Sequence, residues 1–156
     1  MLRPLLIAFV IVSICVVIHI LGLTYLAEAL VARRPKLVTM KTTGHACIVL
    51  VVFAAIVTLH MIETAIWAGF YLWWNLFPDF ETSWYFSLTS YTTIGYGDVT
   101  LPEGWRVLGG IEGFSGVLLC GLSTAFILII LNAMLTNRIQ TFDPGAVPGG
   151  INEIPR

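Results

Sequence analysis

Apolar residues fall into three long blocks along the 156-residue chain. The blocks run over Pro4–Ala27, Ala46–Trp74 and Val107–Ala133, and each is longer than the roughly 20 residues that cross a hydrocarbon core. The pattern predicts an all-α transmembrane protein with three membrane helices over 4–31, 44–75 and 105–137.

The first block has a rival interpretation as a cleaved signal peptide. Ala27-Glu28-Ala29 resembles a small-x-small cleavage site. However, the apolar part of a signal peptide spans only about 7–15 residues, and this block is longer. We therefore expect an additional N-terminal transmembrane helix.

A shorter segment between the second and third blocks breaks the pattern. Phe80–Tyr91 is too short to span a membrane, and the residues after it read TTIGYGD. Non-helical backbone at membrane depth survives only inside protein or beside water. The sequence thus predicts a re-entrant pore helix over 80–91 and a loop over 92–98, with the negative end of the helix dipole facing cations in the membrane.

Composition narrows the function classes. The chain is 58% hydrophobic and 11% charged, against about a quarter charged residues in a soluble domain, and its net charge is -1. Nucleic acid is therefore not an expected partner. Cys15, Cys47 and Cys120 are isolated in apolar runs without metal-ligand or redox spacing, and no nucleophile–base pair suggests an enzyme.

Flanking charges predict the orientation. The first connection carries Arg33, Arg34, Lys36 and Lys41, whereas the connection 75–84 carries only acidic charges. Basic loops stay in the cytoplasm. The N-terminus and the 92–98 loop are thus expected outside, with a flexible tail over 138–156 in the cytoplasm.

The motif Thr93-Ile94-Gly95-Tyr96-Gly97-Asp98 resembles the selectivity filter of tetrameric potassium channels. Tyr85 and Phe86 stand where that family has an aromatic pair beside the filter, and Trp105-Arg106 opens the last span at the usual distance. The resemblance covers about Ala46 to Asn137 and is greatest to small bacterial channels without a voltage sensor. The expected location is a bacterial cell membrane.

The resemblance implies a potassium-selective pore with no cofactor beyond the permeant K⁺. Backbone carbonyls of Thr93, Ile94, Gly95 and Tyr96 would coordinate K⁺, and Gly97 would complete the outer mouth. Ile94 and Tyr96 would face away from the ions and hold the diameter. One loop cannot enclose an ion path, so a homotetramer in the lipid bilayer is expected.

The resemblance also implies supporting residues around the filter. Asp98 would concentrate cations at the outer mouth, while Arg106 is either its partner or a helix-start anchor. Thr92 belongs to the supporting set. Thr89 occupies a position where some relatives have a carboxylate.

Ionisable residues inside the spans are hypotheses of function by default. We predict that His60, Glu63 and Glu112 form one polar cluster that braces the filter from behind, in which case external or internal pH would modulate opening. Alternatively, these groups only satisfy each other and pore-helix hydroxyls such as Ser87 or Thr89. His19 is interpreted as a packed or interfacial residue.

The sequence indicates less about gating than about the other properties. Gly116 lies near the family's hinge glycine, although close packing explains it equally well. Thr124, Leu128 and Asn132 would then face the inner cavity. No span carries the arginine series of a voltage sensor, so the stimulus stays open.

Other functions have weaker support. A non-conducting accessory or sensor subunit has little need of an intact filter, and a weakly selective cation channel is a further alternative. A potassium transporter would carry four pore repeats or degenerate signatures, but the signature occurs once.

Overall fold

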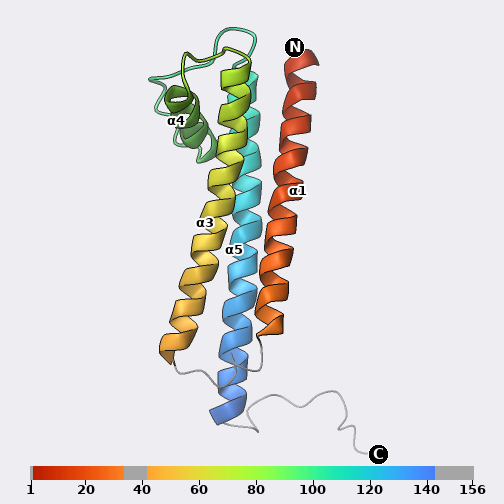
Figure 1. The fold of residues 1–156 in the computed structure, drawn as a ribbon, viewed down its shortest axis with the longest axis vertical. Helices are drawn as coiled ribbons and strands as arrows, with labels where there is room; N and C mark the ends of the chain where they lie inside the picture. The colour runs from red at the N-terminus through yellow and green to blue at the C-terminus, as the bar shows by residue number, and fades with distance from the viewer. Residues whose placement is uncertain (1, 34–41, 143–156) are drawn as a thin grey trace, which may run out of the picture.

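The computed structural model describes residues 2–33 and 42–142, and these residues form four α-helices (Figure 1). The helices are α1 (Leu2–Ala32), α3 (Thr42–Trp73), α4 (Phe80–Tyr91) and α5 (Val107–Phe142). A helix of 30 residues is about 45 Å long at 1.5 Å per residue, so each of the three long helices exceeds the roughly 30 Å of a hydrocarbon core. The segments Leu2–Ala32, Thr43–Trp73 and Val107–Thr136 are long and apolar enough to cross a membrane.

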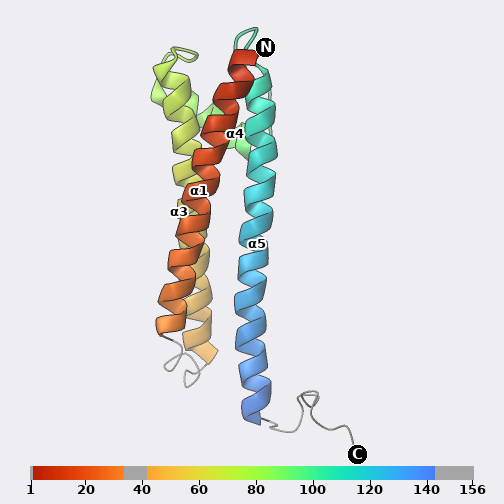
Figure 2. The same ribbon diagram turned by 90° about the vertical axis from the view of Figure 1, so that its right-hand side faces the viewer.

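The three long helices lie side by side, and α1 packs against both α3 and α5 (Figures 1 and 2). The short helix α4 packs between α3 and α5 at the end of the bundle that holds the N-terminus (Figure 1). The N-terminal end of α1 therefore lies at the same end of the molecule as α4 and the loop that follows it.

Aromatic packing holds α4 in place. The ring of Phe86 on α4 meets Tyr71 of α3 edge to face, with centroids 5.4 Å apart, and meets Phe77 at 5.0 Å. Leu101 and Leu108 are buried in the same cluster. Such aromatic pairs add about 0.5–1.5 kcal/mol beyond the area they bury.

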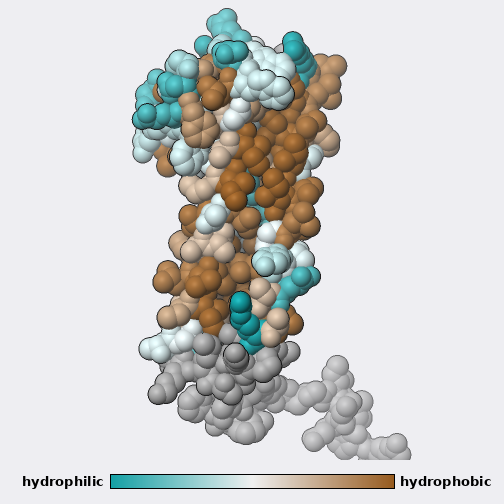
Figure 3. All heavy atoms as spheres, viewed as in Figure 1, coloured by the Kyte–Doolittle hydropathy of each residue, from teal (hydrophilic) through white to brown (hydrophobic). Residues whose placement is uncertain are grey.

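The outer surface of the bundle is largely apolar (Figure 3). Leu and Val side chains on all three long helices are exposed, and at most 22% of the most apolar window of each helix is buried. A large exposed apolar surface needs a covering of lipid or protein. The single chain thus has the surface of a membrane protein.

Helix α5 extends further than the span predicted over 105–137. The sequence analysis ended it at 137 and began a flexible tail at 138, but α5 continues to Phe142. Residues 138–142 contain neither Pro nor Gly, and the first helix-breaking residue is Pro144. The prediction of a tail was therefore wrong for 138–142, and its remainder, 143–156, lies outside the described residues.

Candidate functional site

Helix α4 begins at a well-formed N-cap. The Asp79 carboxylate accepts a hydrogen bond from the Thr82 backbone N–H at 2.7 Å and from the Thr82 hydroxyl at 3.1 Å. The first of these bonds is the main reason why the pKa of Asp79 lies below its usual value. Asp79 and Glu81 also place negative charge at the positive end of the helix dipole.

The loop after α4 has an unusual backbone. Its φ angles are positive at Thr93 (61°), Gly95 (51°) and Gly97 (77°), but not at Ile94 or Tyr96. Alternation in the sign of φ turns successive carbonyl groups toward one side of the chain. A positive φ is rare for a β-branched residue such as Thr93, and strained backbone of this kind concentrates at functional sites.

Backbone hydrogen bonds tie this loop to the last turn of α4. The N–H of Thr93 donates to the Ser90 carbonyl at 2.9 Å, and the N–H of Gly95 donates to the Thr89 carbonyl at 3.0 Å. The hydroxyls of Thr89 and Thr92 donate to carbonyls of their own helix, those of Phe86 (3.0 Å) and Leu88 (2.6 Å). Thus Thr89 does not contact either buried glutamate.

The loop is uncovered in the single chain. Every residue from 92 to 98 is exposed, including Ile94 at 55% and Tyr96 at 70%. The single chain thus leaves the Ile94 side chain and the Tyr96 ring uncovered.

The outer end of the loop is anchored by Tyr85. Its hydroxyl donates to one carboxylate oxygen of Asp98 at 2.7 Å, while the Val99 N–H donates to the other at 3.0 Å. The Tyr85 bond lowers the pKa of Asp98 below its usual value. Arg106 instead donates from Nε to the Leu101 carbonyl at 3.3 Å, which fits the helix-start anchor and not an ion pair with Asp98.

The predicted single cluster behind the loop is divided into two. Glu112 is fully buried and accepts hydrogen bonds from the hydroxyls of Ser87 and Tyr71, the latter at 2.6 Å. It makes no hydrogen bond or ion pair with His60 or Glu63 within the described part of the chain. The grouping of all three residues was therefore wrong.

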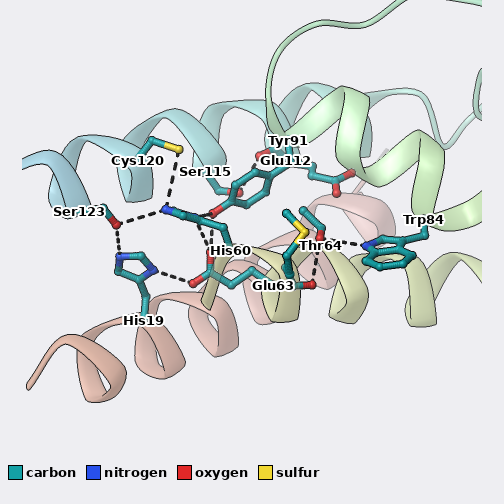
Figure 4. A network of polar contacts seen from close by, with 11 residues as sticks. His19, His60, Glu63, Thr64, Trp84, Tyr91, Glu112, Ser115, Cys120 and Ser123 are labelled. Carbon is teal, nitrogen blue, oxygen red and sulfur yellow. Dashed lines mark hydrogen bonds and ion pairs between the residues drawn. The ribbon is translucent and has the colours of Figure 1, made fainter. Parts of the chain in front are cut away.

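Glu63 forms the centre of the other cluster (Figure 4). Its carboxylate oxygens lie 2.7 Å from Nδ1 of His19 and 3.2 Å from Nδ1 of His60, and it accepts a hydrogen bond from the Tyr91 hydroxyl. The prediction that His19 is a packed residue agrees with its fully buried ring, which also lies against the Glu63 carboxylate. A histidine inside a membrane span is the sequence feature that points to such a contact.

The two clusters contact successive turns of one face of α4. Ser83, Ser87 and Tyr91 are its buried polar residues at intervals of four. Glu112 of α5 bonds to Ser87, and Glu63 of α3 bonds to Tyr91, the last residue of the helix. Both buried carboxylates thus hold the helix that positions the loop.

Helix α5 approaches α4 at glycine residues. A Cβ added at Gly116 would lie 2.1 Å from the Tyr91 carbonyl oxygen, and one at Gly113 would lie 2.8 Å from that of Ser90. Gly116 therefore serves close packing in this structure. Thr124, Leu128 and Asn132 are exposed on the single chain.

Comparison with known proteins decides the family. The pattern of the family described as ion channel matches residues 45–133, more than half of the chain. The chain belongs to the ion channel family. No curated protein and no solved structure gives a match. The family region begins in α3 and ends in α5, so it contains α4 and its loop but not α1.

Family membership bears on the broad functional class. Together with three apolar helices, it indicates an integral membrane protein that functions in ion transport as a channel and not as an enzyme. The family region includes the loop at 92–98, whose residues are all exposed in the single chain.

Proposed function

We propose that this chain is the pore-forming subunit of a potassium-selective channel. K⁺ must exchange its hydration water for protein oxygens to pass selectively, and rows of backbone carbonyls provide them. The observation that carries the proposal is the alternation of φ at Thr93, Gly95 and Gly97, and we infer that this alternation turns the carbonyls of consecutive residues to one side. The carbonyls of Thr93, Ile94, Gly95 and Tyr96 coordinate the ion, with Gly97 at the outer mouth.

The working channel is a homotetramer. A single loop leaves its carbonyls and the side chains of Ile94 and Tyr96 exposed. Four copies around one axis would surround the ion with carbonyls and cover both side chains. The exposed Thr124, Leu128 and Asn132 on α5 then line the inner cavity.

The channel lies in a bacterial cell membrane with the filter outside. The N-terminus and α4 lie at the same end of the bundle, whereas α1 ends and α3 begins at the opposite end (Figure 1). The sequence that joins these two helices is basic, and basic connections stay in the cytoplasm. The end of α5 is therefore cytoplasmic.

The two buried clusters brace the filter from behind. Glu112 holds Ser87 and Glu63 holds Tyr91, so each carboxylate fixes one turn of the helix that carries the filter. If open probability in Glu112→Gln and Glu63→Gln channels equals that of the wild type, the brace has no role in conduction.

Recording from the purified protein in a planar bilayer tests the proposed function. With K⁺ on one side and Na⁺ on the other, the reversal potential should show strong preference for K⁺. Gly95→Ala places a Cβ on a residue with φ of 51° and should lose selectivity or flux while the protein still inserts and assembles. No current would favour an accessory subunit, whereas equal K⁺ and Na⁺ permeability would favour a weakly selective channel.

A further inference from the structure

Two imidazole rings and a carboxylate converge inside the bundle (Figure 4). His19 comes from α1, and His60 and Glu63 come from α3. Their nearest ligand atoms all lie within 4.8 Å of one another. We propose that His19, His60 and Glu63 form a zinc-binding site.

The donor set fits zinc. Imidazole nitrogen and carboxylate oxygen are standard zinc ligands at about 2.0–2.2 Å, which places neighbouring ligand atoms of a tetrahedron about 3.3 Å apart. The Nδ1 atoms of His19 and His60 lie 2.7 and 3.2 Å from the carboxylate oxygens of Glu63. Each of these two distances is thus within about 0.6 Å of the tetrahedral spacing. Ca²⁺ and Mg²⁺ instead require about six oxygen ligands.

A single hydroxyl orients both rings. Oγ of Ser123 on α5 lies 3.0 Å from Nε2 of His19 and 3.2 Å from Nε2 of His60. When both Nε2 atoms carry the proton and donate to this oxygen, both Nδ1 lone pairs face Glu63. Outer contacts of this kind fix the tautomer of metal-binding histidines.

Charge balance identifies the fourth ligand. Zn²⁺ bound to one carboxylate and two neutral imidazoles keeps one positive charge, which is costly to bury. The Tyr91 hydroxyl lies 2.8 Å from Nδ1 of His60 and bonds to Glu63. On binding, a Zn–O bond forms to Tyr91 and its phenolic proton leaves to solvent, so the site becomes neutral.

The site lies near the edge of the bundle and would have a structural consequence. The His60 side chain is 13% exposed, and it lies beside the exposed Cys120, whose Sγ is 4.0 Å from Nε2 of His60. Bound zinc would link α1 and α3 to Tyr91 at the end of α4, two residues before Thr93. Zinc binding does not rest on potassium selectivity, because metal content is measured without any current.

Metal content of the purified full-length protein tests the proposal. The protein is stripped with a chelator, reloaded with Zn²⁺, freed of excess ion and assayed by elemental mass spectrometry. We expect one zinc per chain in the wild type. His45→Gln is the matched control, because His45 lies fifteen residues, or about 22 Å, before His60 on α3.

The variants separate the roles of ligands and of the orienting hydroxyl. His60→Gln, Glu63→Gln and Tyr91→Phe should lose stoichiometric zinc, whereas Ser123→Ala should weaken zinc affinity about 10–100-fold. If His19→Gln fails to assemble, His60→Gln and Ser123→Ala decide the question. Equal zinc content in wild type and His60→Gln, or equal loss in His45→Gln, would overturn the proposal.

Cobalt gives an independent measurement of geometry. Co²⁺ loaded in place of zinc should show the intense visible absorption of tetrahedral coordination, and Tyr91→Phe should change that spectrum. A spectrum like that of octahedral aqueous Co²⁺ would contradict a site built from these four residues.

Discussion

Single hydrogen bonds at the outer mouth set the charge that a cation meets first. Tyr85 donates to Asp98 and holds the pKa of its carboxyl below the usual 3.8. Because its pKa is depressed, Asp98 carries its full negative charge at every pH above the ordinary pKa of an aspartate. This charge is lost only as the pH falls through the lower pKa that Asp98 has in the folded protein.

Tyr85→Phe should therefore shift the acid sensitivity of the channel. Without the hydroxyl, the pKa of Asp98 returns toward 3.8, so protons on the filter side should reduce K⁺ conductance at a higher pH than in the wild type. Single-channel conductance as a function of pH measures the midpoint. Tyr25→Phe, at an exposed position of α1, is the control, and identical midpoints for Tyr85→Phe and wild type would contradict the expectation.

Gly116→Ala tests the close approach of α5 to α4. The added methyl group would overlap the Tyr91 carbonyl, and overpacking of this kind costs about 1–3 kcal/mol. Thermal unfolding of the purified protein should show the loss of stability. Gly69→Ala, where a Cβ meets no atom within 4 Å, should stay within about 1 kcal/mol of wild type. Equal melting temperatures for Gly116→Ala and wild type would rule out the tight contact.

At the scale of elements, α4 is held by hydrogen bonds from both neighbouring helices. Glu112 accepts from Ser87 of α4 and from Tyr71 of α3, so one carboxylate joins three helices. A glutamine in its place has one acceptor oxygen, and its NH₂ group cannot accept from the second hydroxyl.

Glu112→Gln should consequently reduce the open probability of the channel several-fold or more, because leaving a buried hydroxyl without its acceptor costs about 1–3 kcal/mol. Single-channel recording measures this change. Ser115→Ala is the control, since the Ser115 hydroxyl bonds only within α5, to the Glu112 carbonyl. A similar effect in both variants would place the cause in α5 and not in the brace.

Short-range features of these elements could be predicted from the sequence, but long-range partners could not. The limits of α4 follow from residues at its own ends, and the filter motif is a contiguous run. By contrast, His19 and Glu63 are 44 residues apart, and α1 is apolar on every side. No stripe in the sequence shows which face of α1 meets α3, so the role of His19 and the separation of Glu112 from Glu63 needed the packed structure.

At the scale of the molecule, the single chain leaves the 92–98 loop, including the Ile94 and Tyr96 side chains, and much of α5 exposed. Symmetric assembly covers such surfaces with copies of the same chain.

Chemical cross-linking of the purified protein should therefore yield species of up to four chains and no larger ladder. The filter variant Gly95→Ala should give the same pattern, because its substitution lies in the loop and not on the long helices. A series that ends at two chains would contradict the tetramer.

The most direct test of the central claim is the reversal potential of purified wild-type channels between equal concentrations of K⁺ and Na⁺. A filter lined by the carbonyls of Thr93–Tyr96 predicts a reversal potential close to the value for permeation by K⁺ alone. A reversal potential near zero, which means equal permeability for the two ions, would contradict a potassium-selective pore.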